Sequence, residues 1–253
     1  MLDLTTIPDV RAWSRAQRAG GRRIGVVPTM GYLHEGHLTL VDEARRRSDS
    51  VILTIFVNPL QFGPREDLAR YPRDLPRDRS LARSRGVDAL FVPAVEAMYP
   101  PGSEVRVSPG PTAERWEGAA RPGHFTGVLT VVAKLFHLIE PDVACFGRKD
   151  LQQLTLVRQM VRDLDWPIEI VGIPTVREPD GLALSSRNAY LNPADRQRAL
   201  VLSRALHTAH QAYCRGERQA AILEQRMLEQ LNREPEVQVE YIAITEPDQL
   251  QPV

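Results

Sequence analysis

The sequence predicts an α/β protein in which a parallel sheet is covered by helices on both faces. Short, continuous apolar runs alternate with segments whose apolar residues recur at helical spacing. Continuous apolar strands separated by helices are typical of parallel strands that are buried on both sides. The chain has 253 residues, of which 43% are apolar and 25% charged, so it can build a sizeable core.

The elements of this sheet are expected between residues 24 and 173. We expect strands at residues 24–27, 51–57, 88–92, 143–146 and 168–173, and helices at residues 38–47, 75–85, 125–139 and 151–164. Prolines follow several of these segments and end them, because proline has no backbone N–H to donate. The helix at 125–139 is apolar, but it is short and contains Lys134, so no membrane partner is expected.

The pattern changes after residue 176 and predicts a second, smaller α+β unit. Helices are expected at residues 193–215 and 219–231, followed by a strand at 237–244. We therefore expect a first domain, built on the parallel sheet, at residues 1–175 and a smaller C-terminal domain at residues 176–253.

Charge and cysteine content limit the class of protein. The formal net charge is zero, which argues against a protein that coats nucleic acid. Cys145 and Cys214 are the only cysteines, and the first residues contain no basic segment followed by an apolar one. A reducing, cytoplasmic location is therefore expected.

Two histidines lie where the first strand turns into a helix. His34 and His37 belong to the segment Pro-Thr-Met-Gly-Tyr-Leu-His-Glu-Gly-His at residues 28–37. At a spacing of three they share one face of the first helical turn, whose free N–H groups attract phosphate. Two imidazole donors there suit a polyphosphate whose charge rises during reaction. A structural role is the alternative. Zinc would require a third protein ligand, and no Cys or His with ligand spacing lies near.

Further polar residues follow the other strands at the edge where ligands of such sheets bind. Gln61 follows the second strand, residues 147–150 (Gly-Arg-Lys-Asp) follow the fourth, and residues 184–187 (Leu-Ser-Ser-Arg) follow the last. Lys149 and Lys134 are the only lysines among 32 basic residues, which indicates that a compact ammonium is wanted at Lys149. Surface turns and a helix cap are the structural alternatives for these segments.

Three residues could bind other parts of a ligand. Gln61 and Gln153 suit a molecule with hydroxyls or a carboxylate. Asp78 could ligate Mg²⁺ that is held mainly by phosphates, although a solvated aspartate is the default on a polar helix. The chain has no Gly-x-x-x-x-Gly-Lys-Ser/Thr segment, so a P-loop enzyme is not expected.

These motifs together resemble the pantothenate synthetase (pantoate–β-alanine ligase) family of His-x-Gly-His nucleotidyltransferases. The segments that carry the resemblance are residues 28–37, 56–62, 71–73, 121–125, 146–153 and 180–188. The family implies that ATP and pantoate form pantoyl adenylate and pyrophosphate. The amine of β-alanine then attacks, giving pantothenate and AMP. It also implies a Rossmann-like domain, a smaller C-terminal lid domain and a homodimer.

The resemblance also implies roles for individual residues. The ATP site would contain Met30, Gly31, Tyr32, Leu33, His34, Glu35, Gly36, His37, Gly147, Arg148, Lys149, Asp150, Val176, Leu184, Ser185, Ser186 and Arg187. His37, His34, Lys149 and Arg187 would be catalytic, with His37 as the proton donor. Gln61 and Gln153 would hold pantoate, Gln61 would also lie near β-alanine, and Asp78 would lie near Mg²⁺.

The chain departs from the family pattern at two places. Arg148 stands where the family usually has Glu, and the chain stops at Val253, before the further strands that family members usually have. The small domain is therefore expected to be incomplete. The alternatives are another His-x-Gly-His nucleotidyltransferase, acting on a phosphate ester, or a protein that binds ATP without turnover.

Overall fold

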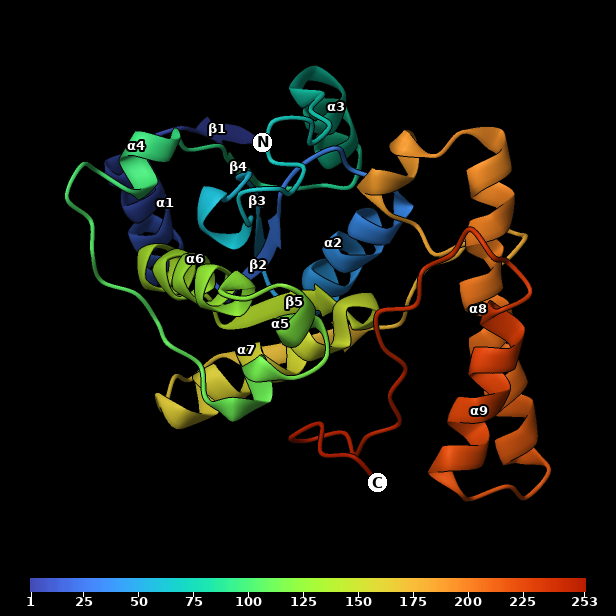
Figure 1. Cartoon of the computed structure of the whole chain (residues 1–253). Coiled ribbons are helices and arrows are strands. Elements are labelled where there is room, and N and C mark those ends of the chain that lie inside the picture. Colours follow the sequence, from blue (N-terminus) through green and yellow to red (C-terminus); the bar gives the residue numbers. More distant parts are fainter. The chain divides into compact units, whose positions relative to one another are not determined.

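A six-stranded, wholly parallel sheet forms the centre of the first unit, residues Met1–Thr175. The computed structural model describes the whole chain, Met1–Val253 (Figure 1). The strands are β1 (Leu2–Leu4), β2 (Ile24–Thr29), β3 (Ser50–Ile55), β4 (Ala89–Phe91), β5 (Val143–Gly147) and β6 (Glu169–Ile173), in the spatial order β1-β4-β3-β2-β5-β6. The predicted parallel α/β fold is thus confirmed.

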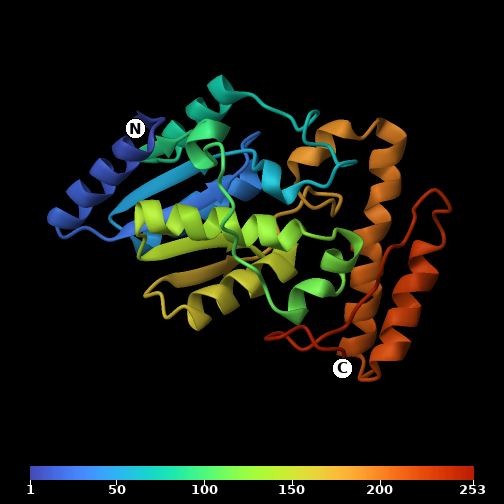
Figure 2. The same cartoon turned by 60° about the vertical axis from the view of Figure 1, so that its left-hand side comes forward.

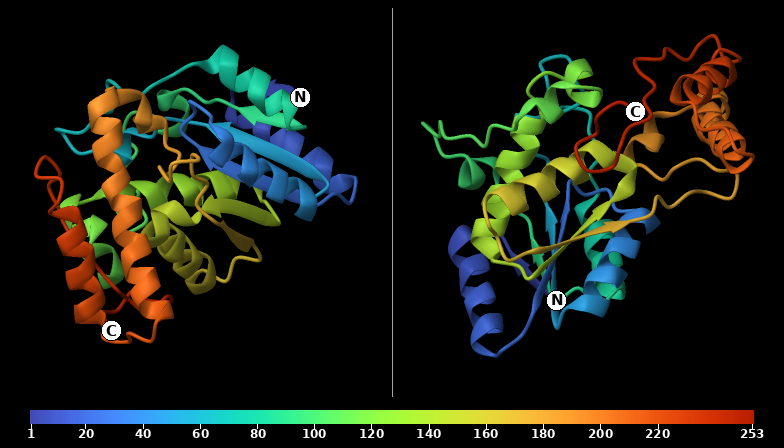
Figure 3. Two further views of the ribbon diagram at one scale, coloured as in Figure 1. Left: turned by 90° about the vertical axis from the view of Figure 1, so that its right-hand side faces the viewer. Right: turned by 90° about the horizontal axis from the view of Figure 1, so that it is seen from below.

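Helices cover both faces of this sheet, as Figure 2 and the right-hand view of Figure 3 show. One face packs against α1 (Ile7–Ala19), α6 (His124–Ile139) and α7 (Leu151–Asp163), and the other against α2 (Glu35–Arg47) and α3 (Leu75–Ser84). Successive strand residues alternate between these two cores: Val26 belongs to the first and Val27 to the second, and both are fully buried. The continuous apolar strands of the sequence follow from this double burial.

The strand order places a crevice between β2 and β5. From β2 the chain continues to one side through β3 and β4, and later to the other side through β5 and β6. The β2–β5 ladder contains only the pairs Gly25–Val143 and Val26–Ala144, whereas β2 pairs with β3 as far as Thr29. Ligands of doubly wound sheets bind beyond the strand ends at such a reversal.

Shorter elements connect these layers. They are α4 (Val95–Met98), α5 (Glu117–Ala120) and the 3₁₀ turns Pro59–Gln61, Pro111–Glu114, Arg148–Asp150 and Ser186–Tyr190. Strand β1 and helix α1 were not predicted from the sequence. No helix in the structure combines the length and the apolar character needed to cross a membrane.

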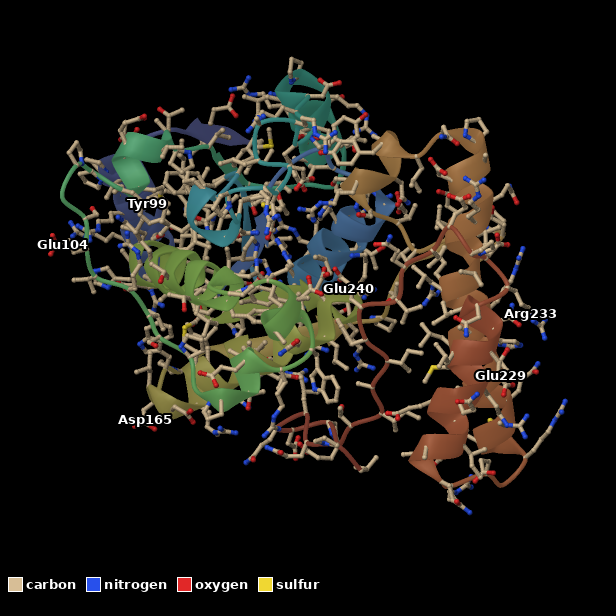
Figure 4. All side chains as sticks on the ribbon, in the orientation of Figure 1. Tyr99, Glu104, Asp165, Glu229, Arg233 and Glu240 are labelled. Carbon is tan, nitrogen blue, oxygen red and sulfur yellow. The ribbon has the colours of Figure 1, made fainter.

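The second unit, residues Val176–Val253, is mainly helical. Helices α8 (Pro193–Cys214) and α9 (Ala220–Leu231) pack through a small apolar core, while Glu229 and Arg233 lie on its surface (Figure 4). The strand expected at residues 237–244 is wrong, because this extended segment pairs with no other strand. Its apolar side chains Val237, Ile242 and Ile244 pack against the helices instead.

The two cysteines occupy different environments. Cys145 is buried in β5, and burial raises the pKa of its thiol to about 12. Cys214, the last residue of α8, is exposed. Both are free thiols.

We predict that Gly127→Ala destabilises the protein, although alanine normally favours a helix. A Cβ atom at Gly127 would lie 2.1 Å from the carbonyl oxygen of Leu60, so α6 and the Pro59–Gln61 turn would have to separate. Overpacking of this kind costs roughly 1–3 kcal/mol, which a denaturant titration would measure. Gly110→Ala is the control, because a Cβ there meets no atom within 4 Å. Equal stability of the two variants would contradict the prediction.

Candidate active site

The turn between β2 and α2 has a backbone that the surrounding residues hold in a restricted conformation. Gly31 has φ +85°, and a Cβ atom there would lie 2.9 Å from a methyl carbon of Ile55, so only glycine fits without a shift. Tyr32 follows with φ +50°, which is uncommon for a residue with a side chain. The turn therefore places the next residues, His34 to His37, by a specific backbone path.

Hydrogen bonds from α3 and β2 hold this turn in place. The N–H of Tyr32 donates to Asp78 Oδ2 at 2.8 Å, and the N–H of Leu33 donates to Asp78 Oδ1 at 2.7 Å. Arg77 Nη1 donates to the carbonyl of Leu33 at 2.8 Å. The hydroxyl of Thr29 accepts the N–H of Gly31 at 3.1 Å. These four hydrogen bonds pair the backbone of the turn with side chains of β2 and α3, and so fix its conformation.

The two histidines lie at the start of α2, as the sequence predicted. His34 is the N-cap residue, and its backbone N–H donates to Nδ1 of His37 at 3.4 Å. The two rings stack with their centroids 4.0 Å apart. Because Nδ1 of His37 accepts a hydrogen bond, the proton of the neutral ring is on Nε2. Nδ1 of His34 is buried and has no hydrogen-bond partner.

Both imidazoles are neutral at physiological pH. Burial lowers the pKa of His34 to about 4, and the positive charges of Lys149 and Arg77 add to the effect. Burial likewise lowers the pKa of His37 to about 3, with further contributions from His34 and Lys149. The site therefore combines neutral N–H donors from the β2–α2 turn with one ammonium from the end of β5.

The other predicted residues at the end of β5 make local contacts. Lys149 forms an ion pair with Asp150 at 3.2 Å and is 41% exposed, so its ammonium is accessible to a ligand. Arg148 Nε donates to the carbonyl of Gly172 on the edge strand β6 at 3.1 Å. Arg148, which stands where the family usually has Glu, is therefore bonded to the edge strand and not to the histidines.

Gln61 is held beside the histidine turn. Its Nε2 lies 3.2 Å from Met30 Sδ, and its Oε1 accepts a hydrogen bond from Asn58 Nδ2 at 3.1 Å. Asn58 is buried, donates to the carbonyl of Gly127 at 3.1 Å and accepts from Tyr99 Oη at 3.0 Å. Figure 4 labels Tyr99 close to α4. The sequence predicted Gln61 but not the buried asparagine that orients it.

A cluster of charged residues supports the backbone of Gln61. His124 Nδ1 donates to the carbonyl of Gln61 at 2.8 Å, while its Nε2 lies 3.2 Å from Arg121 Nη1. Arg121 forms ion pairs with Glu66 at 2.5 Å and Glu117 at 3.1 Å. His124 and Arg121 lie in a motif that carried the family resemblance, but nothing in their spacing indicated this role.

Two adjacent glutamines at the start of α7 differ in their environment. Gln152 is buried, and its side chain donates to the carbonyls of Thr112 and Arg115 at 2.8 and 2.9 Å and accepts the N–H of Glu117 at 3.1 Å. Its amide therefore holds the loop before α5. Gln153, the residue predicted to bind substrate, is half-buried and makes none of these bonds.

The predicted residues of the second unit form a turn of their own. The N–H of Leu184 donates to the carbonyl of Val176 at 3.0 Å. Ser185 precedes the 3₁₀ turn Ser186–Tyr190, and its hydroxyl accepts the N–H of Arg187 at 3.2 Å. Ser185 thus caps the 3₁₀ turn, as the structural alternative for this segment predicted. The next residue, Ser186, is buried.

The structure gives Asp78 hydrogen-bond partners in the turn, whereas the sequence predicted that it could lie near Mg²⁺. The residue is only 1% exposed, and each carboxylate oxygen already accepts a backbone N–H. Burial raises the pKa of this carboxyl, and the two N–H groups oppose that rise. Mg²⁺ prefers several oxygen ligands in octahedral geometry, whereas both oxygens of this carboxylate are turned to the backbone of the turn. No group of three His, Cys, Asp or Glu residues in the structure could hold a metal ion.

A cavity of about 280 Å³ adjoins the turn on the side of α3. Its wall combines the turn, the ends of β3 and β4, and the start of α3, including Met30, Phe56, Arg73 and Pro93. The space lies beyond the carboxyl ends of the strands, where ligands of this fold bind.

A doubly wound sheet with neutral imidazoles and an ammonium at the β2–β5 reversal defines an α/β nucleotide-binding enzyme of the His-x-Gly-His type. Comparison with known proteins gives the family. The family model described as pantoate-beta-alanine ligase matches residues 3–253. The chain belongs to the pantoate–β-alanine ligase family.

Individual relatives agree with this assignment. A pantothenate synthetase from Moorella thermoacetica is 56% identical over 250 residues, which are 99% of this chain and 88% of that protein. The crystal structure of pantothenate synthetase from Thermus thermophilus matches with a TM-score of 0.95 and 52% identity, covering 100% of this chain and 90% of that chain. The crystal structure of the Francisella tularensis ligase, complexed with β-γ ATP and β-alanine, matches with a TM-score of 0.79 and 36% identity, covering 91% of this chain and 86% of that chain.

We predict that His37 stays neutral, with its proton on Nε2, at pH values far below the ordinary histidine pKa of about 6.5. NMR of ¹⁵N-labelled histidines would show this as a ring that does not titrate between pH 7 and pH 5. The unfolded chain in urea is the control, because its histidines titrate normally. A His37 that protonates near pH 6.5 in the folded protein would overturn the assignment.

The same pKa difference predicts how stability depends on pH. Between about pH 6.5 and pH 3 the unfolded chain binds protons that the folded site excludes, so the free energy of unfolding falls as pH falls. His37→Gln should make this dependence shallower in denaturant titrations. An unchanged slope in the variant would contradict the prediction.

Proposed function

We propose that this chain condenses pantoate with β-alanine by way of a pantoyl adenylate. The whole-length family match supports the substrates, and the neutral histidine pair beside Lys149 supports the adenylation chemistry. In the first step a pantoate carboxylate oxygen bonds to the α-phosphorus of ATP, and the bond to pyrophosphate breaks. In the second step the amine of β-alanine bonds to the acyl carbon, AMP leaves and the amine loses a proton.

The phosphates would be bound by donors from two strand ends. Nε2–H of His37 donates to a phosphate oxygen, and the Lys149 ammonium neutralises charge that gathers on the leaving pyrophosphate. A neutral histidine acts here as a hydrogen-bond donor, and a full proton transfer from it would require bound phosphate to raise its pKa first. Residues 30–37 and 147–150, together with Val176 and residues 184–187 of the second unit, are the proposed ATP-binding residues.

The carboxylic acid would be bound by neutral amides. Gln61, which is tied to Met30 and Asn58, and the half-buried Gln153 offer donors and acceptors to the hydroxyls and carboxylate of pantoate. Gln61 also serves β-alanine in this proposal. Positioning of the amine and exclusion of water should dominate the second step, because the mixed anhydride is already reactive.

The proposed enzyme also uses Mg²⁺, forms a homodimer and is cytoplasmic. Mg²⁺ would enter on the ATP phosphates, since the described residues do not fit a protein-held ion. The homodimer rests on the resemblance alone. The cytoplasmic location is supported by the two free cysteines.

A coupled pyrophosphate assay tests the reaction. Purified protein is given ATP and pantoate, with and without β-alanine, and pantothenate is measured by mass spectrometry. We expect pyrophosphate release to require pantoate, and pantothenate and AMP to form only with β-alanine. Pyrophosphate release with a phosphorylated alcohol in place of pantoate would favour the other nucleotidyltransferases, and ATP binding without any release would indicate an inactive protein.

The two lysines provide a matched pair of variants. We predict that Lys149→Ala slows adenylation strongly but changes the thermal midpoint little, since an exposed ion pair contributes at most ~1 kcal/mol. Lys134 donates to the carbonyl of Met98 and lies 5.5 Å from the Tyr99 ring centroid. Lys134→Ala should therefore lower the thermal midpoint and leave adenylation unchanged. The reverse pattern in single-turnover assays and melting curves would refute the role of Lys149.

The two glutamines of α7 provide a second pair. We predict that Gln153→Ala weakens the use of pantoate by roughly 1–3 kcal/mol while ATP binding is retained. Gln152→Ala should instead lower the thermal midpoint, because it leaves three backbone groups near α5 without their partner. ATP is titrated by calorimetry and pantoate by initial rates. Equal weakening of both ligands in Gln153→Ala would leave its pantoate role unsupported.

A further inference from the structure

Asp78 is a buried carboxylate that is hydrogen-bonded to the turn between β2 and α2, the turn that precedes His34. It lies in the first turn of α3, while the groups it bonds belong to the segment that follows β2. Its residue is 1% exposed, so its charge is stabilised by few solvent molecules. A buried carboxylate of this kind is retained only where strong donors satisfy it, and here the donors are the N–H groups of Tyr32 and Leu33.

Those two N–H groups belong to the part of the turn with unusual backbone angles. Gly31 adopts φ +85° at little cost because it has no Cβ atom, whereas φ +50° at Tyr32 is strained for a residue with a side chain. A Cβ atom at Gly31 would lie 3.1 Å from Asp78 Oδ2, which shows how closely the carboxylate approaches the backbone. Asp78 thus offsets the cost of the strained conformation and sets the direction in which the chain enters α2.

Arg77 reinforces the same contact from the neighbouring position. It donates to the carbonyl of Leu33, and its guanidinium lies 5.5 Å from the centroid of the Tyr32 ring. The start of α3 therefore bonds two backbone N–H groups and one carbonyl of Tyr32 and Leu33. His34 is the next residue of the chain. Movement of the turn would move both imidazoles relative to Lys149.

We infer that Asp78 is a positioning residue that holds the β2–α2 turn so that His34 and His37 meet the phosphates, and that it does not bind metal. This inference rests on the proposed function, because it gives the histidine pair its purpose. A displacement of about 1 Å in a catalytic group can lower a rate about 100-fold. The effect should therefore appear in kcat for adenylation rather than in the magnesium requirement.

The test compares Asp78→Asn with Asp142→Asn. Asparagine has the shape of aspartate, but it keeps one acceptor oxygen and turns an NH₂ group toward a backbone donor. Asp142 Oδ2 accepts the N–H of Ile24 at 2.7 Å, so it has the same kind of bond at the opposite, amino-terminal edge of the sheet. Both substitutions should lower the thermal midpoint, but only Asp78→Asn should lower kcat for pantoate-dependent pyrophosphate release, by about 10- to 100-fold.

Two readouts separate positioning from metal binding. Hydrogen exchange should become faster at the amides of Tyr32 and Leu33 in Asp78→Asn, without ATP or metal present, and remain slow in Asp142→Asn. A titration with Mg²⁺ should give the wild-type half-saturating concentration. A raised magnesium requirement with unchanged exchange would overturn the inference, as would a wild-type kcat in Asp78→Asn.

The controls keep the inference separate from the proposed function. If the wild-type protein releases no pyrophosphate with pantoate, the proposed function fails, whereas the exchange measurement still tests the contact. If Asp78→Asn does not fold, Arg77→Ala removes the bond to the Leu33 carbonyl and should also lower kcat. A folded Arg77→Ala variant with wild-type kcat and exchange would then count against the inference.

Discussion

Strand β2 is hydrogen-bonded to β5 over two residue pairs, and the end of this short ladder determines where chemistry can occur. On their other sides both strands stay paired further along, β2 with β3 as far as Thr29 and β5 with β6 as far as Gly147. The loops that leave β2 and β5 therefore face a common opening, one carrying the histidines and the other Lys149. If β2 and β5 paired along their full length, backbone hydrogen bonds would occupy the edge that the ligand needs.

The electrostatics of the site follow from what this opening admits. Its histidines are partly buried and lie near a permanent cation, and both conditions disfavour a charged imidazole. Neutral N–H donors bind a polyphosphate without the full desolvation cost of additional cations. The Lys149 ammonium then adds positive charge beside these donors, which suits a reaction in which negative charge gathers on a leaving group.

The sequence predicted the parallel sheet and the placement of His34, His37 and Lys149, because buried strands and helical spacing are local patterns. It did not predict the bonds of Asp78, since these join residues 45 and 46 positions apart and depend on which side of α3 faces the turn. The strand at residues 237–244 was wrong for a related reason. A β-branched, apolar segment forms a strand only if a neighbouring edge is available, and here helices occupy that place.

The contrast between the two cysteines makes the native chain a reporter of its own folding. The Cys145 thiol is buried in the central sheet and holds its proton, so a thiol-specific dye reaches it only when the sheet opens. Cys214, at the exposed end of α8, reacts without unfolding. One dye label per molecule would therefore mark the folded state and two labels the unfolded state, with no engineered residue. A fluorophore attached to Cys214 would report separately on the unfolding of the second unit.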